Sequence, residues 1–167
     1  MKGAPLDEVH VKQLCLEVAP EPHRLGYLYM ATMRLLHQIF SRRFAAWGLT
    51  PPQFGTLMLL ASLHKASLKD VARHAIGDAP TLCRIVDRLE RQGLVRRDMA
   101  EGDRRLRAIE LTPEGSDTAR KTSEAYAQVE ERLLEGISEE ERQLLRQLML
   151  RVLRNAIALV KEDQRQP

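Results

Sequence analysis

The sequence has only two cysteines and no long apolar run, and these shortages exclude several classes of protein. Cys15 and Cys83 lie far apart, so they provide neither a disulfide framework nor the Cys-x-x-Cys spacing of a zinc site. This usage predicts a reducing, cytoplasmic setting. Apolar runs never approach about eighteen residues, so no membrane span is expected. The N-terminus lacks a basic segment followed by an apolar run, so no signal peptide is expected.

Sequence motifs of catalysis are also missing. There is no glycine-rich phosphate loop, no His-Glu-x-x-His pair and no nucleophile elbow. The acidic residues are numerous, but they fall on the polar faces of expected helices, where solvation explains them. We therefore predict that the protein is not an enzyme, and that it uses no cofactor and no metal.

The composition is that of a globular chain with a sizeable core. Of its 167 residues, 44% are hydrophobic and 29% are charged, and the formal net charge is +3. Such a mild positive charge permits a nucleic-acid partner without requiring one. The argument for function therefore depends on where the charges lie.

Hydrophobic periodicity and capping signals divide the chain into helices and one hairpin. Apolar residues recur at helical spacing in seven segments. Thr50 and Asp78 are expected helix caps, and Gly48 is expected to end the long helix before Thr50. The expected helices are 6–18, 24–47, 50–63, 67–74, 79–92, 112–135 and 138–160, and the expected strands are 94–98 and 106–111.

This order predicts a mainly α protein with a small β-hairpin. The pair 67–74 and 79–92 forms a helix-turn-helix, and the hairpin after it forms a wing. The predicted parts are an N-terminal segment with the first dimerisation helix (1–48), a winged helix-turn-helix lobe (49–112) and the C-terminal dimerisation helices (113–167), all within one structural domain. The long terminal helices carry more apolar surface than one small lobe can cover, which predicts a homodimer.

The helix 79–92 is the expected recognition helix, because its outward face is polar and an α-helix fits the major groove. Arg84 suits a bidentate contact to guanine, and Thr81 suits a thymine methyl group or a phosphate. A solvated amphipathic helix would show a similar pattern. The predicted DNA contacts on this helix are Thr81, Cys83, Arg84, Asp87 and Arg88.

The hairpin adds a second concentration of arginine. Arg96 and Arg97 lie on its first strand, and arginine at a hairpin tip suits the narrow minor groove. Asp103 is expected to pair with an arginine rather than contact DNA. A charge run is often only a solvated surface, but this one directly follows a helix-turn-helix. The predicted DNA contacts of the hairpin are Arg104, Arg105 and Arg107.

Four segments together resemble the MarR family of bacterial regulators. They are an L-x-x-x-A helix at 68–72, D-R-L-E-x-x-G-L-V at 87–95, D-R-R at 103–105 and L-T-x-x-G at 111–115. Each motif is weak alone, but all four occur in the family's order and spacing. The resemblance implies a homodimer that binds pseudo-palindromic double-stranded DNA, commonly as a repressor.

The resemblance also implies release from DNA by a small effector, often an aromatic acid. In the family, this ligand binds between the dimerisation helices and the DNA-binding lobe. Arg34 or His37 would receive an acidic group, and methionines would supply adaptable apolar walls. The candidate effector residues are Met30, Met33, Arg34, His37, Phe54 and Met58.

Two alternatives remain open from the sequence. One is a repressor controlled by cysteine oxidation, since Cys83 lies near a helix N-terminus beside Arg84. Glu17, two residues after Cys15, opposes thiolate formation at that cysteine. The other alternative is a winged-helix module that binds a protein instead of DNA.

Overall fold

The computed structural model describes residues 24–74, 78–99 and 107–163. The predicted helix 6–18, the turn at 76–77 and the expected pairing of Asp103 lie outside these residues. The chain divides into two compact units, Met1–Ala125 and Tyr126–Pro167. The three-part division expected from the sequence stays a prediction.

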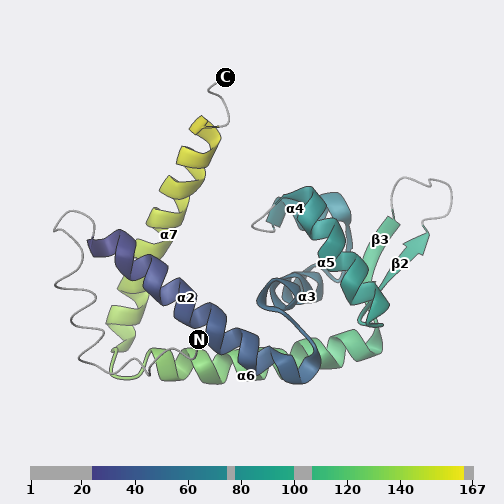
Figure 1. Cartoon of the computed structure of the whole chain (residues 1–167), viewed down its shortest axis with the longest axis horizontal. Coiled ribbons are helices and arrows are strands. Elements are labelled where there is room, and N and C mark those ends of the chain that lie inside the picture. Colours follow the sequence, from purple (N-terminus) through teal and green to yellow (C-terminus); the bar gives the residue numbers. More distant parts are fainter. Residues whose placement is uncertain (1–23, 75–77, 100–106, 164–167) are drawn as a thin grey trace, which may run out of the picture. The chain divides into compact units, whose positions relative to one another are not determined.

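The elements follow the expected order, and the fold class is confirmed. The helices α3, α4 and α5 lie together with the β2–β3 hairpin in the first unit (Figure 1). In chain order the elements are α2 (Arg24–Phe44), the 3-10 helix η2 (Ala45–Trp47), α3 (Pro51–Leu63), β1 (Lys65–Ser67), α4 (Leu68–His74), α5 (Ala79–Arg91), β2 (Val95–Met99), β3 (Arg107–Leu111), α6 (Pro113–Leu133) and α7 (Glu139–Asp163).

The sheet has three strands, and this corrects the prediction of a two-stranded hairpin. Its order is β1-β3-β2, and both pairings are antiparallel. The added strand β1 lies in the segment before α4, where Ala66 pairs with Ile109 and both are buried. Ser67, expected at the start of the helix, is the last residue of β1 and also caps α4, because its hydroxyl oxygen accepts a hydrogen bond from the Asp70 N–H (3.2 Å).

Aliphatic and aromatic side chains form the core of the first unit. Phe44 and Phe54 stack with ring centroids 4.3 Å apart, which packs the end of α2 against α3. Leu57 and Leu60 of α3 and Val71 of α4 are fully buried. Gly48 adopts the expected left-handed conformation, with φ of 63°, and turns the chain between η2 and α3.

Three helix starts are capped by carboxylates. Asp78 accepts a hydrogen bond from the Thr81 backbone N–H (2.6 Å), Asp70 from that of Ser67 (3.1 Å), and Glu141 from that of Ser138 (2.8 Å). These bonds favour the ionised form, so they lower the pKa of each carboxyl; for Asp70 the Ser67 hydroxyl has the largest effect.

These lowered pKa values predict a loss of stability in acid. Because the unfolded carboxyls bind protons more readily than the folded ones, the caps contribute fully above the ordinary pKa of about 4. The contribution disappears as the pH falls through the lower folded-state values. Urea unfolding at pH 6 and pH 3 is expected to show this loss. Asp78→Asn still caps but does not titrate, so it should lose less stability over the same range. An equal loss in the two proteins would contradict a role for Asp78.

Candidate nucleic-acid interface

The helix α5 has one buried apolar side and one exposed polar side. Leu82, Val86 and Leu89 are buried, at the i, i+4, i+7 spacing of a single helix face. Of the predicted contacts, Thr81, Arg84, Asp87 and Arg88 are exposed and Cys83 is half-buried. The buried face anchors α5 to the core, so the polar face is available to a partner.

The guanidinium of Arg97, on β2, joins the wing to α5. Its Nη2 lies 2.5 Å from Asp87 Oδ1, and its Nη1 lies 2.5 Å from Glu90 Oε2. Burial alone would lower the pKa of Arg97, but the Asp87 hydrogen bond and the Glu90 charge outweigh it, so the pKa is raised. Asp87, predicted as a DNA contact, is therefore placed to hold the wing strand.

Sequence reasoning counted Arg97 among the wing arginines but did not assign it this role. The signal was present, because Asp87 and Glu90 are three residues apart and share a helix face. Arg96, its neighbour on β2, points to the other face of the sheet and pairs with Glu110 at 2.7 Å. The side chains of Arg104, Arg105 and Arg107 lie outside the described parts of the chain, so their DNA contacts stay predictions.

We expect Arg97→Met to destabilise the protein by about 1–2 kcal/mol. The side chain is only 23% exposed, so its removal leaves two carboxylates without their cation in a partly desolvated place. Arg96→Met is the matched control, since that side chain is 68% exposed, and its cost should stay below about 0.5 kcal/mol. Urea unfolding of both variants measures the difference. Equal costs would show that the Arg97 contacts contribute no more than a surface ion pair.

The start of α6 holds the turn that follows α5. The Thr112 hydroxyl donates to the Gly93 carbonyl (2.6 Å), and the Thr112 N–H donates to the Leu94 carbonyl (3.1 Å). The Gly115 N–H in turn donates to the Thr112 hydroxyl oxygen (2.9 Å). A Cβ on Gly115 would lie 1.8 Å from the Leu94 oxygen, so only glycine permits this approach. The L-T-x-x-G segment therefore fixes the turn that follows α5.

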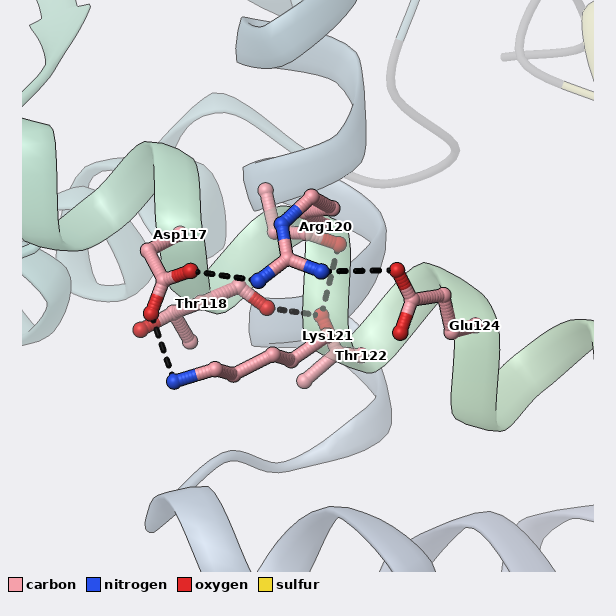
Figure 2. Close-up of polar contacts among 7 residues, drawn as sticks. Asp117, Thr118, Arg120, Lys121, Thr122 and Glu124 are labelled. Atoms are coloured by element: carbon pink, nitrogen blue, oxygen red, sulfur yellow. Dashed lines mark hydrogen bonds and ion pairs between the residues drawn. The ribbon is translucent and has the colours of Figure 1, made fainter.

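The next turn of α6 carries cations that already have carboxylate partners. Figure 2 shows Asp117 between Arg120 (2.8 Å) and Lys121 (2.6 Å), with Arg120 also reaching Glu124 (2.8 Å). The pKa of Asp117 is lowered, first by the Lys121 hydrogen bond and then by that of Arg120. By contrast, Arg84 and Arg88 make no ion pair among the described residues. Arg84 is close enough to Asp78 to help lower the pKa of that carboxyl, but neither guanidinium is held in an ion pair within the described ranges, so both can reach a ligand from the exposed face of α5.

The candidate effector residues fall into two groups in the first unit. Met30, Met33, Arg34 and His37 are exposed on α2, and the Ser41 hydroxyl lies 3.4 Å from His37 Nδ1. Phe54 and Met58 are half-buried on α3, where they are one turn apart. Their role in ligand binding stays a prediction, as does redox control through half-buried Cys83.

Metal sites and membrane spans are both absent from the described part of the chain. Within 24–74, 78–99 and 107–163, no cluster of three or more His, Cys, Asp or Glu side chains could hold a metal ion. No helix in these ranges is both long and apolar enough to span a membrane.

The arrangement of α4, α5 and the β2–β3 hairpin defines a winged helix-turn-helix protein. A family model described as MarR family matches residues 47–106. Transcriptional regulator HosA from Escherichia coli is 31% identical over 125 residues, covering 71% of this chain and 91% of that protein. The chain therefore belongs to the MarR family; it is a DNA-binding transcriptional regulator and not an enzyme.

Solved structures show the same fold at lower sequence identity. MepR from S. aureus, in a structure described as a DNA complex, has a TM-score of 0.73 and 21% identity, covering 82% of this chain and 99% of that chain. BpsR from Bordetella bronchiseptica has a TM-score of 0.71 and 23% identity, covering 80% of this chain and 96% of that chain. Its structure is described as showing a mechanism for the regulation of BpsR DNA binding by 6-hydroxynicotinic acid.

Proposed function

We propose that this chain is a cytoplasmic, homodimeric repressor that binds a pseudo-palindromic operator and leaves it when a small aromatic acid binds. Each protomer would place α5 in the major groove of one half-site, with the wing arginines at the adjacent minor groove. The two recognition helices would then lie about one DNA turn apart, roughly 34 Å.

The observation that carries this proposal is the exposed polar face of α5. Arg84 and Arg88 stand on it without an ion pair among the described residues, while Arg97 on the neighbouring strand β2 is held by two carboxylates. An arginine left unpaired beside a wing suits phosphate or guanine edges, which supply the missing acceptors.

The dimer part of the proposal is supported by the apolar surface of α7. Among the described residues of this helix none is buried, although its apolar side chains form a broad stripe. Leu145, Leu148 and Val152 lie near the centre of that stripe and are 39–45% exposed. A helix with so large an apolar side is stable in water only when a second surface covers it, and a second copy of α7 provides one.

The effector part rests on the side chains of α2 and α3 and on BpsR, whose DNA binding is described as regulated by an aromatic acid. Arg34 and His37 offer cationic or hydrogen-bonding groups for a carboxylate, and Met30, Met33, Phe54 and Met58 offer apolar contacts. A thermal-shift screen of aromatic carboxylic acids, followed by DNA-release assays, tests it. If no acid both stabilises the protein and releases DNA, this part of the proposal fails.

The DNA-binding part is tested by selecting duplexes from a random pool with the purified protein. The selected duplex should be two-fold symmetric, and its binding should weaken steeply with salt as counterions are released from phosphates. Failure to select any duplex, or affinity independent of salt, would favour the protein-binding alternative.

We expect Arg84→Ala to relax base preference at one position of each half-site. A bidentate contact to guanine discriminates by about 1–3 kcal/mol, so the preference there should fall roughly tenfold. Arg105→Ala should instead weaken all duplexes more evenly, as expected for a wing contact with little base selectivity. Binding to the selected duplex and to its single-base variants measures both. A wild-type preference in Arg84→Ala would remove that residue from the base-reading set.

A further inference from the structure

Two glutamine side chains connect the carboxyl end of α5 to the corner between η2 and α3. Gln53 Nε2 donates to Gln92 Oε1 (3.0 Å), and Gln92 Nε2 donates to the carbonyl of Gly48 (3.0 Å). Gln53 Oε1 accepts from both the backbone N–H and the hydroxyl of Thr50 (2.9 Å each). We call this chain of contacts, from Thr50 through Gln53 and Gln92 to Gly48, the amide relay.

The relay fixes the orientation of both amide groups. In each one the oxygen accepts and the nitrogen donates, so turning either group over would place like groups against each other. Gln53 is only 2% exposed, and a buried amide left without partners is costly. The contacts therefore support one another, although Gln92 itself lies at the surface.

Two residues of the relay, Gly48 and Gln92, lie where a helix ends. Gly48 is left-handed and begins the turn into α3, while Gln92 is the C-cap of α5 and its N–H donates to the Arg88 carbonyl (3.1 Å). Hydrogen bonds are directional, whereas the apolar contacts of Leu82, Val86 and Leu89 tolerate small shifts. The relay is therefore suited to set the register of α5 on the core.

A small rotation at the carboxyl end of α5 has a large effect at its other end. Thirteen residues span about 20 Å, so a turn of about 5° about Gln92 moves the first residues by nearly 2 Å. Contacts to base edges need hydrogen-bond distances within a few tenths of an ångström, whereas phosphate attraction falls off slowly. A shift of this size would thus affect specific binding more than non-specific binding.

We propose that Gln53 and Gln92 are positioning residues for DNA reading, which set the angle of α5 through the corner between η2 and α3. This inference rests on the proposed function, because it concerns how the same helix reads DNA. Neither side chain needs to contact the duplex. A shift of the backbone at the end of α2 would therefore alter the orientation of α5 through the relay.

The variant Gln92→Met keeps the length of the side chain and removes its hydrogen bonds. We expect its affinity for the selected duplex, relative to a random duplex at the same salt, to fall roughly tenfold, with random-duplex affinity within about twofold of wild type. Gln143→Met is the control, because it also removes an exposed glutamine hydrogen bond (to Glu139, 3.3 Å) but lies on α7. An unchanged ratio in Gln92→Met would overturn the proposal.

The double variant Gln53→Met/Gln92→Met tests whether the two residues act as one unit. Its specificity ratio should match that of Gln92→Met, while independent, additive losses would contradict the relay. Amide hydrogen exchange provides a readout without DNA: Gln92→Met should speed exchange at Gly48–Thr50 as well as at the end of α5. If the wild type selects no duplex, the proposed function fails. If Gln92→Met speeds amide exchange only at the end of α5 and not at Gly48–Thr50, the relay fails, whatever the protein binds.

Discussion

Glutamate at both Leu145 and Val152 is expected to convert the protein to a monomer and to weaken operator binding at least about 100-fold. These residues are seven positions apart, so they lie on the same side of α7, and both are exposed in the single chain. In a two-fold interface each substitution appears twice, so four charges would be placed where apolar side chains meet. Binding by two linked recognition helices would become binding by one, which removes the gain from effective concentration.

Sedimentation equilibrium measures the mass of this variant, and binding to the selected duplex measures the functional loss. The matched control Gln147→Glu/Arg154→Glu adds two glutamates, also seven residues apart, to the polar side of the same helix. It should remain a dimer and lose far less affinity. A variant Leu145→Glu/Val152→Glu that keeps twice the chain mass would show that another surface forms the dimer.

Gly115→Ala is expected to destabilise the protein by about 3 kcal/mol or more. The new Cβ would meet the Leu94 oxygen at 1.8 Å and the Leu94 carbonyl carbon at 2.8 Å, both backbone atoms that no rotamer change can move. Relief requires α6 to move away from the end of α5, which breaks the Thr112 hydrogen bonds to Gly93 and Leu94. The melting temperature should fall by roughly 10 °C.

The control Gly55→Ala should change stability in the opposite direction. Gly55 is within α3, and a Cβ there would have no atom within 4 Å apart from the helix's own nearby backbone and its chain neighbours. Alanine in an exposed helix position is favoured over glycine by about 0.5–1 kcal/mol. Thermal unfolding at one protein concentration compares the two variants. If both raise the melting temperature, the close approach at Gly115 does not constrain the fold.

Most of the fold could be predicted because its signals are local. Helical periodicity placed α2, α3 and α5 within a few residues, and the caps at Thr50 and Asp78 follow from the intrinsic hydrogen-bonding capacity of those residues. The strand β1 was missed because it gives no such local signal. It has three residues and a single buried one, Ala66, so its structure depends on pairing with β3 and not on its own pattern.

The candidate interface divides in the same way. The outward polar face of α5 follows from the spacing of Leu82, Val86 and Leu89, so the exposed position of Arg84 could be derived from the sequence. The sequence places Asp87 and Glu90 on one face of α5, but it does not identify Arg97 as their partner, since that residue lies on a strand and the pairing depends on how the strand packs against α5.

The amino-acid sequence by itself therefore determined the order of the helices and the hairpin, the helix caps and the family, because these depend on periodicity, on turn chemistry and on motifs in a fixed order. The tertiary structure alone decided which groups from distant segments of the chain meet. It joined Gln53 to Gln92, Arg97 to Asp87 and Gly115 to Leu94, because contacts between distant segments are set by the geometry of packing and leave little trace in the local pattern.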